Sequence, residues 1–157
     1  MSSLFSNIAC CIDLTENNED IIAYTREMAE LTGAKILLVH VLPSASSFAN
    51  YGASQELLQK VAAESRAETK KYVTELAAKY FAGLNCEPLI LTGSVDAAIT
   101  ELVDKSCADL VVMGSLNSSG LFNFSGKTSA RLIGKSRVPV MIIPNDLSLE
   151  CSPEEDF

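Results

Sequence analysis

The stretch that decides the fold runs from residue 109 to residue 144 and reads DLVVMGSLNSSGLFNFSGKTSARLIGKSRVPVMIIP. Residues 110–113 form a short uncharged aliphatic run that stops at Gly114, a pattern typical of a strand buried on both faces. Small residues and glycines follow, then residues 127–136 with helical spacing, then a second aliphatic run over residues 138–143. A strand, a small-residue loop and a helix N-terminus in this order form a candidate anion cradle. The first N–H groups of a helix lack partners and lie at the positive end of its dipole.

The composition indicates one ordered domain that repels polyanions. The chain has 157 residues, of which 48% are hydrophobic, and this is enough for a core of its own. The net charge is −8, from 12 basic and 20 acidic residues, so nucleic acid and anionic membranes are poor partners. No membrane span and no secretory signal are evident. We therefore expect a cytoplasmic domain over residues 1–147, followed by an acidic tail over residues 148–157.

The cysteines and the single histidine predict neither a metal site nor a catalytic centre. The cysteines form no CxxC pair, and their odd number is typical of reduced thiols. We interpret all five as structural or incidental: Cys10, Cys11, Cys86, Cys107 and Cys151. His40 lies within an apolar run without a second histidine, so we interpret it as a packed core residue. No paired carboxylates and no triad stand out, and we expect no catalytic residue.

Aliphatic runs that alternate with helical segments predict a parallel α/β fold. Helical spacing is found at about residues 19–31, 54–80, 95–106 and 127–136, and Thr15 or Asn17 is available as the N-cap of the first of these helices. We expect Leu58, Tyr72 and Leu76 of the second helix to belong to the core. Strands that alternate with helices of this length form a parallel sheet covered on both faces. Ligands of such sheets bind beyond the carboxyl ends of the strands, where the strand order reverses. This rule gathers three parts of the chain around one crevice: Asp13, the segment after Val41, and the loop after Gly114.

Several of these segments resemble the universal stress protein family, and the resemblance extends over essentially the whole chain. The matching pieces are IACCID at residues 8–13, VHV at 39–41, ADLVVMGS at 108–115 and VPVMIIP at 138–144. The last two pieces, at this separation, are specific together. The resemblance implies a five-stranded parallel sheet with helices on both faces, in an adenine nucleotide alpha hydrolase-like (Rossmann-like) three-layer sandwich. It also implies a homodimer paired through the last strand, from Val138 to Ile143.

Nucleotide-binding members of that family carry Gly-x2-Gly-x9-Gly-Ser/Thr after the fourth strand, and this chain resembles that motif with changes. Gly114 matches the first glycine, and Asn117 takes the place of the second. Counting forward puts the third glycine at Lys127, whereas counting back from residues 138–139 puts it at Gly126 and the Ser/Thr at Lys127. We prefer the second alignment, with one residue deleted from the loop, because it preserves the apolar phase of the helix. Asn tolerates positive φ better than other substitutes for glycine, and a lysine beside phosphates compensates for part of a lost backbone contact.

The resemblance implies a regulatory protein that binds an adenine nucleotide, ATP or AMP, without a metal site. The implied site consists of Asp13, Val41, Gly114, Asn117, Gly120, Gly126, Lys127, Thr128 and Ser129. Asp13 would lie near the ribose and adenine, or would instead cap the first helix, and both roles stay open. Val41 would offer its backbone groups to adenine.

Other interpretations of the same residues remain. Residues 126–128, GKT, suggest a P-loop, but Leu121 stands where a Walker loop needs its first glycine. The same fold without nucleotide, acting as a protein-interaction module in a stress response, is the alternative function. Slow ATP hydrolysis is a third hypothesis, and it lacks an evident base or metal ligand beyond Asp13.

Overall fold

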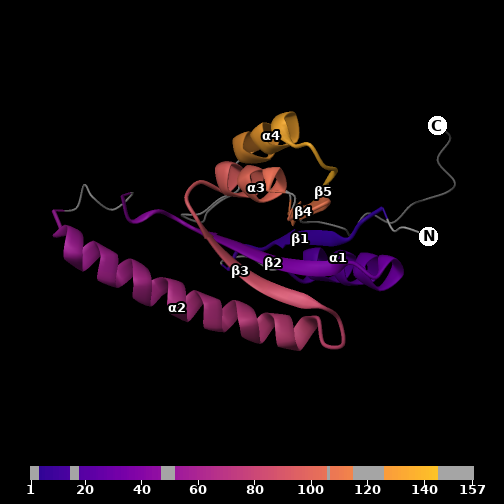
Figure 1. Ribbon diagram of the computed structural model, residues 1–157, viewed down its shortest axis with the longest axis horizontal. Helices are drawn as coiled ribbons and strands as arrows, with labels where there is room; N and C mark the ends of the chain where they lie inside the picture. The colour runs from indigo at the N-terminus through magenta and orange to yellow at the C-terminus, as the bar shows by residue number, and fades with distance from the viewer. Residues whose placement is uncertain (1–3, 15–17, 47–51, 106, 115–125, 145–157) are drawn as a thin grey trace, which may run out of the picture.

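The computed structural model describes residues 4–14, 18–46, 52–105, 107–114 and 126–144, without the side chains of 126–129. Strands and helices alternate along these residues, as Figure 1 shows from indigo at the start to yellow at the end. The elements are β1 (Asn7–Cys11), α1 (Glu19–Thr32), β2 (Lys35–Leu42), α2 (Gln55–Tyr80), β3 (Cys86–Thr92), α3 (Val95–Asp104), β4 (Leu110–Gly114), α4 (Gly126–Lys135) and β5 (Val140–Ile143). This order confirms the predicted α/β class.

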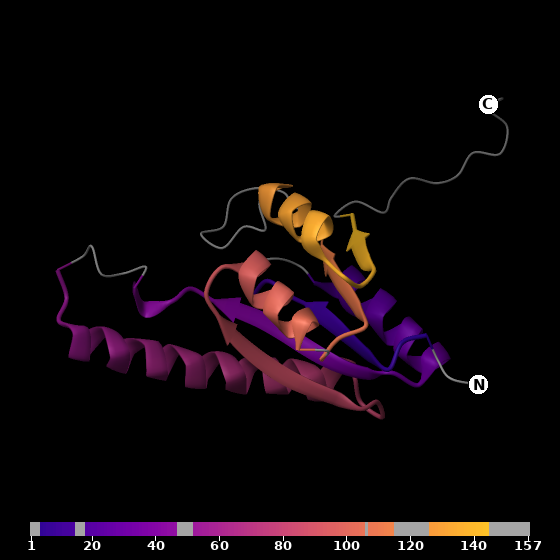
Figure 2. The same cartoon turned by 45° about the horizontal axis from the view of Figure 1, so that its top comes forward.

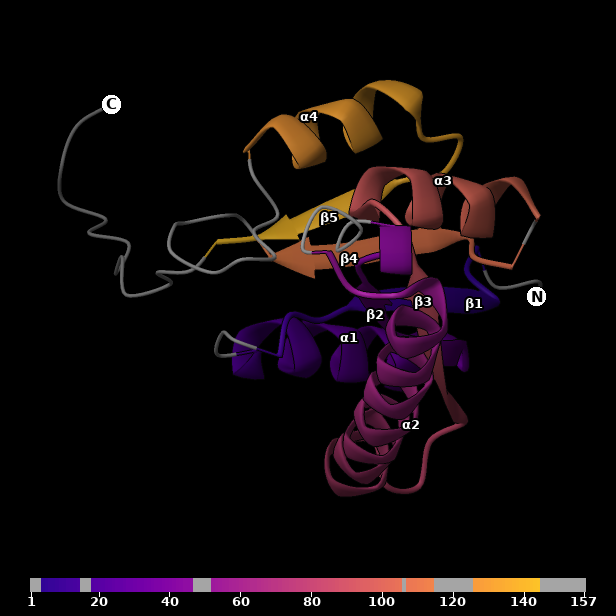
Figure 3. The ribbon, with the colours of Figure 1, turned by 90° about the vertical axis from the view of Figure 1, so that its left-hand side faces the viewer.

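The five strands form one parallel sheet in the order β3-β2-β1-β4-β5. The chain first builds outward from β1 through β2 to β3, and then returns to the other side of β1 with β4 and β5. The strand order therefore reverses between β1 and β4. Figure 3 looks along the sheet and shows three layers, with α1 and α2 on one side and α3 and α4 on the other. The predicted five-stranded sandwich with helices on both faces is confirmed.

Both faces of the sheet are buried, which explains why its strands carry so few charges. Ile8, Cys10 and Ile12 contribute to the core beneath α1 and α2, whereas Ala9 and Cys11 contribute to the core beneath α3 and α4. This alternation follows from the two-residue period of a strand. A sheet covered on both faces selects continuous apolar runs instead of alternating ones.

The carboxylate of Asp109 joins the two strands that flank the reversal of strand order. Its Oδ2 accepts hydrogen bonds from the backbone N–H groups of Ser6 at 2.8 Å and Asn7 at 2.9 Å. The Asp109 N–H donates in turn to the carbonyl of Asn7 at 2.8 Å. These three bonds align the start of β4 with the start of β1, and so set which residues emerge together at the opposite, carboxyl edge.

Helix α1 begins after Asn18, so the prediction of Thr15 or Asn17 as its N-cap was wrong. The Asn18 side chain bonds the backbone of Asp13 instead of an N–H of the helix. The buried stripe Ile21, Ile22, Thr25 and Ala29 has the predicted spacing. Gly33 ends the helix in the left-handed conformation, at φ 72°, where glycine carries no steric penalty.

Helix α2 is longer than the sheet that it covers. Its 26 residues span about 39 Å, whereas the eight residues of β2 span about 26 Å. Figures 1 and 2 show its N-terminal half extending beyond the carboxyl ends of β2 and β3. Its buried residues, Val73 and Ala77, lie in the other half. The prediction of Tyr72 as core was wrong, because the stripe that faces the sheet passes through Val73 and leaves Tyr72 48% exposed. Leu76 does pack against the core as predicted, and Leu58 is half-buried.

No helix in the described part of the chain combines the length and the apolar character needed to cross a bilayer.

Candidate functional site

The sequence predicts a binding site at the carboxyl edge of the sheet. In the register of β1, Cys11 lies beside Met113 of β4 and beside Val39 of β2. Gly114 follows Met113 directly, while Asp13 and Val41 each come two residues after these paired positions. The structure thus brings Asp13, Val41 and Gly114 to one edge, with the reversal of strand order between the first and the last of them.

Asp13 is buried at this edge, with 6% of its surface exposed. Its backbone N–H donates to Oδ1 of Asn18 at 3.1 Å, and the Asn18 Nδ2 group donates back to the Asp13 carbonyl. This pair of bonds closes the turn from β1 into α1 and fixes the Asp13 backbone. Sequence reasoning missed Asn18, although an asparagine directly before two acidic residues, Glu19 and Asp20, is a typical start of a helix.

His40 supports the same turn from β2. Its Nδ1 lies 3.0 Å from the carbonyl oxygen of Ile12, and the ring is buried. Because a carbonyl only accepts hydrogen bonds, this contact assigns the proton to Nδ1. The Ile12 N–H donates to the Val39 carbonyl at 2.9 Å. The interpretation of His40 as a packed core residue is confirmed, and the ring holds the residue directly before Asp13.

Gly114 lets α1 approach the end of β4 closely. A Cβ atom at this position would lie 3.0 Å from Cδ1 of Ile21 in α1, which is closer than nearly all real contacts of a Cβ atom. The described glycines with positive φ are Gly33, Gly52, Gly83 and Gly93, so the backbone of Gly114 does not itself require glycine. The close approach of the Ile21 side chain therefore favours glycine here independently of any ligand.

Helix α4 begins at Gly126, one residue before the predicted start. The N–H groups of its first three residues, 126–128, have no acceptor within the helix. Helices α1, α2 and α3 each carry an acidic residue in the first turn, and α4 carries none. Its first turn contains Lys127 instead, which adds charge of the same sign as the dipole end. The N-terminus of α4 is thus the described helix start best suited to an external anion.

The rest of the predicted loop lies outside the described residues. Asn117 and Gly120 belong to this part, and for Lys127, Thr128 and Ser129 the structure gives the backbone only. The P-loop interpretation gains no support, since β4 ends at Gly114 and α4 begins at Gly126, a longer separation than a Walker loop allows.

The buried cysteines stay protonated at neutral pH and are therefore unreactive. Desolvation by burial raises the pKa of the Cys10 thiol to about 12 and raises the pKa of Cys11 further still. Desolvation also raises the pKa of Cys86 to about 11. A thiol that stays protonated is a poor nucleophile and a poor metal ligand, which agrees with a structural role. Within the described residues, no three His, Cys, Asp or Glu side chains are grouped closely enough to hold a metal ion.

A doubly wound parallel sheet, with a buried carboxylate at its reversal point, defines a Rossmann-like α/β domain. The sequence profile of the Universal stress protein family matches residues 4–144, and the chain belongs to this family. Among curated protein sequences, no relative matches.

Solved structures of similar fold include universal stress proteins. Hypothetical protein MJ0577 has 18% sequence identity and a TM-score of 0.74, over 92% of this chain and 99% of its own. The universal stress protein from Archaeoglobus fulgidus, solved in complex with dAMP, has 20% identity and a TM-score of 0.59, over 89% of this chain and 98% of its own. A universal stress protein family member from Arabidopsis thaliana, solved with AMP bound, has 20% identity and a TM-score of 0.57, over 90% of this chain and 93% of its own. At these identities the likeness establishes the fold.

Proposed function

We propose that this universal stress protein is a regulatory protein that binds an adenine nucleotide, ATP or AMP, at the carboxyl edge between β1 and β4. The observation that carries the proposal is the start of α4 at Gly126, in a first turn without acidic residues, in a sheet whose reversal point holds the buried Asp13. Open α/β sheets bind ligands at this point, and helix N-termini bind phosphate. The dAMP and AMP complexes of proteins of the same fold support the choice of nucleotide.

Each part of the nucleotide has a proposed partner in this chain. The phosphates would accept hydrogen bonds from the N–H groups of residues 126–128, with the Lys127 ammonium adding charge. The Asp13 carboxylate would accept a hydrogen bond from a ribose hydroxyl, as acidic residues do in related α/β sites. Adenine would lie against the backbone of Val41, which any side chain permits. Gly114, Asn117 and Gly120 would give the loop room to approach the phosphates.

We further propose that the protein acts in the cytoplasm as a homodimer paired through β5. That strand lies at one edge of the sheet, so one side of its backbone is open to pairing. Val140, Met141 and Ile142 are half-buried in the single chain, which leaves apolar surface for a second copy to cover. The domain would end near residue 147, with residues 148–157 as an acidic tail.

The alternative function is an interaction module of the same fold that binds no nucleotide. The observation in its favour is Asn117, which stands at the motif's second glycine and adds a side chain where backbone should approach a phosphate. Slow ATP hydrolysis stays a third hypothesis, for which the sequence offers no evident base or metal ligand beyond Asp13.

The test that separates these two functions begins with the protein as purified. Acid releases any bound small molecule, which mass spectrometry then identifies. An adenine nucleotide at a near-stoichiometric amount supports the proposed function. Purified protein that releases none, and that also fails to bind added nucleotide, supports the interaction module.

A further inference from the structure

We propose that the protein has a second ligand site, under the overhanging half of α2, for an aliphatic chain with an anionic head group. A cavity of about 570 Å³ lies there, between α2 and the ends of β2 and β3. Its volume falls within the usual range of small-molecule sites. None of the residues of the proposed nucleotide site lines it. The inference goes beyond the proposed function and does not depend on it.

The cavity and the proposed nucleotide site lie on different sides of β2, because consecutive residues of a strand point to opposite faces of the sheet. Val41 packs into the core beneath α3 and α4, whereas Leu42, the next residue, packs toward α2 and lines the cavity. The two ligands would therefore lie on opposite sides of the end of β2.

The cavity walls are apolar because the overhang continues a hydrophobic stripe past the end of the sheet. Leu57, Leu58, Val61 and Ala62 line the cavity from the helix side. Leu57 is 51% exposed and Val61 is 54% exposed, although they are neighbours at i and i+4 on the same helix face. Exposed apolar side chains that line a hollow together are typical of a binding site.

Arg66 supplies the charge that selects an anionic head group. Its Nη1 donates to the Thr92 hydroxyl at 3.1 Å, and both side chains line the cavity. A guanidinium carries five N–H donors, so this bond leaves most of them available. The ion pairs formed within the described part of the chain use Arg26, Lys35, Lys105 and Arg137, and Arg66 is not among them. An arginine beside apolar walls and without a carboxylate fits an anion, which it can bind through two parallel hydrogen bonds.

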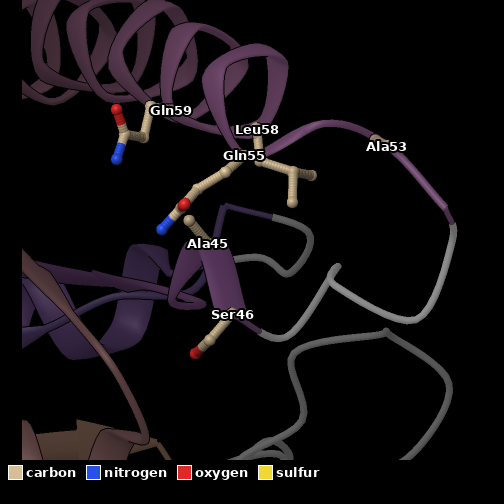
Figure 4. A pocket seen from close by; sticks show the side chains of 6 residues that line it. All are labelled: Ala45, Ser46, Ala53, Gln55, Leu58 and Gln59. Carbon is tan, nitrogen blue, oxygen red and sulfur yellow. The ribbon is translucent and has the colours of Figure 1, made fainter.

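The residues around the cavity also limit how the ligand is oriented and how long its apolar tail can be. A second hollow of about 370 Å³ adjoins the first at Leu58, and Figure 4 shows the amide side chains of Gln55 and Gln59 on its walls. The apolar tail would thus lie between Arg66 and Leu57 and stop before these amides. Leu57 and Arg66 are about 14 Å apart along the helix, so an extended chain of ten carbons, roughly 11 Å long, fits between them.

Calorimetric titration with decanoate, below its micelle concentration, tests this site on the full chain. We expect saturable binding of one decanoate per chain, and binding of octanoate about fifteenfold weaker, since each buried methylene contributes about a fourfold gain. Saturation with ATP should leave decanoate binding unchanged, so that this inference and the proposed function can fail separately.

Three variants locate the ligand. Arg66→Gln should weaken decanoate binding at least tenfold and leave binding of 1-decanol, which has the same chain without the charge, unchanged. Ala62→Phe should fill the cavity and abolish binding of both. Lys71→Gln, which removes an exposed positive charge elsewhere on α2, should change neither.

Several results would overturn the inference. Decanoate that does not bind, or that binds equally well to the Arg66→Gln and Ala62→Phe variants, excludes the site. The site is also excluded if a second copy of the chain covers this face of α2. Sedimentation would then show a dimer that Val61→Glu dissociates. Circular dichroism of each variant verifies that it is folded.

Discussion

A Cβ atom on Gly114 would lie 3.0 Å from Cδ1 of Ile21, so α1 and the end of β4 meet side by side at the reversal point of the sheet. The neighbour is the tip of a flexible side chain, so Gly114→Ala should be tolerated at a cost of about 1–3 kcal/mol, the usual range for overpacking. Urea unfolding measures this cost. Gly134→Ala is the matched control, because its Cβ position has no neighbouring atom within 4 Å apart from its chain neighbours and the backbone of α4 itself.

The two glycine variants should change the free energy of unfolding in opposite directions. Alanine in the interior of a helix is more stable than glycine by about 0.5–1 kcal/mol, and Gly134 lies in the last turn of α4, so Gly134→Ala should stabilise the protein by at most this amount. Shortening the neighbour in the double variant Gly114→Ala with Ile21→Val should recover part of the loss. If Gly114→Ala stabilises as much as Gly134→Ala, the packing explanation of Gly114 is wrong.

The sequence predicts features that depend on neighbouring residues better than contacts between residues far apart in the chain. The order of elements was predictable because strands such as residues 110–113 and 140–143 are uncharged apolar runs with clear ends. The contact between Gly114 and Ile21 was not, since it joins residues far apart in the chain. Tyr72 was misassigned for a similar reason, because periodicity in α2 does not reveal which of its stripes faces the sheet, and that stripe passes through Val73.

The candidate site was predictable in part. Parallel topology alone brings Asp13, Val41 and Gly114 to one edge, and the structure has that topology. The bonds between Asn18 and Asp13, and between His40 and Ile12, depend on side-chain geometry that no spacing rule supplies. Asn117 and Gly120 lie outside the described residues, so their role stays a prediction.

The buried thiols predict a pH dependence of stability at alkaline pH. The folded pKa of Cys10 is raised to about 12 from an ordinary value of 9.0, and that of Cys11 is raised as well. Above pH 9 the unfolded chain therefore loses protons that the folded chain keeps. The free energy of unfolding should fall by up to about 1.4 kcal/mol per pH unit for each thiol, and the stabilisation is fully present below pH 9.

Urea unfolding between pH 8 and pH 10.5 measures that slope. The double variant Cys10→Ala with Cys11→Ala should show a shallower decline than the natural protein, because the other alkaline groups are unchanged. Cys107→Ala is the control, since this thiol is exposed. Equal slopes in the natural protein and the double variant would show that the two thiols do not contribute.

The proposed dimer should dissociate when charge is placed on β5. Met141 is half-buried in the single chain, so Met141→Glu should give monomers in sedimentation velocity and retain the helical content. Ile143 is a poorer choice, because it is buried and a charge there would unfold the domain. Leu31→Glu, at a residue that is 80% exposed on α1, is the control and should leave the dimer intact. A dimer that persists in Met141→Glu must use another surface.

Gly126 and His40 should differ in their effect on nucleotide binding. Gly126→Val places a branched side chain at the first residue of α4 and should weaken ATP binding at least tenfold. His40→Ala removes the bond to the Ile12 carbonyl, which should cost about 1–3 kcal/mol of stability and change affinity less than threefold. Fluorescence titration with a labelled ATP, together with urea unfolding, separates the two effects. Equal losses of affinity would mean that the phosphates lie elsewhere.

The most direct test of the central claim is a calorimetric titration of the nucleotide-free protein with ATP and with AMP, followed by a thermal melt. We expect saturable binding of one nucleotide per chain. At a hundred times Kd the ligand should stabilise the fold by about 2.7 kcal/mol. For a domain of this size that gain corresponds to a rise in Tm of about 5–10 °C. Neither binding heat nor a shift of Tm at millimolar concentrations of both nucleotides would contradict the proposed function.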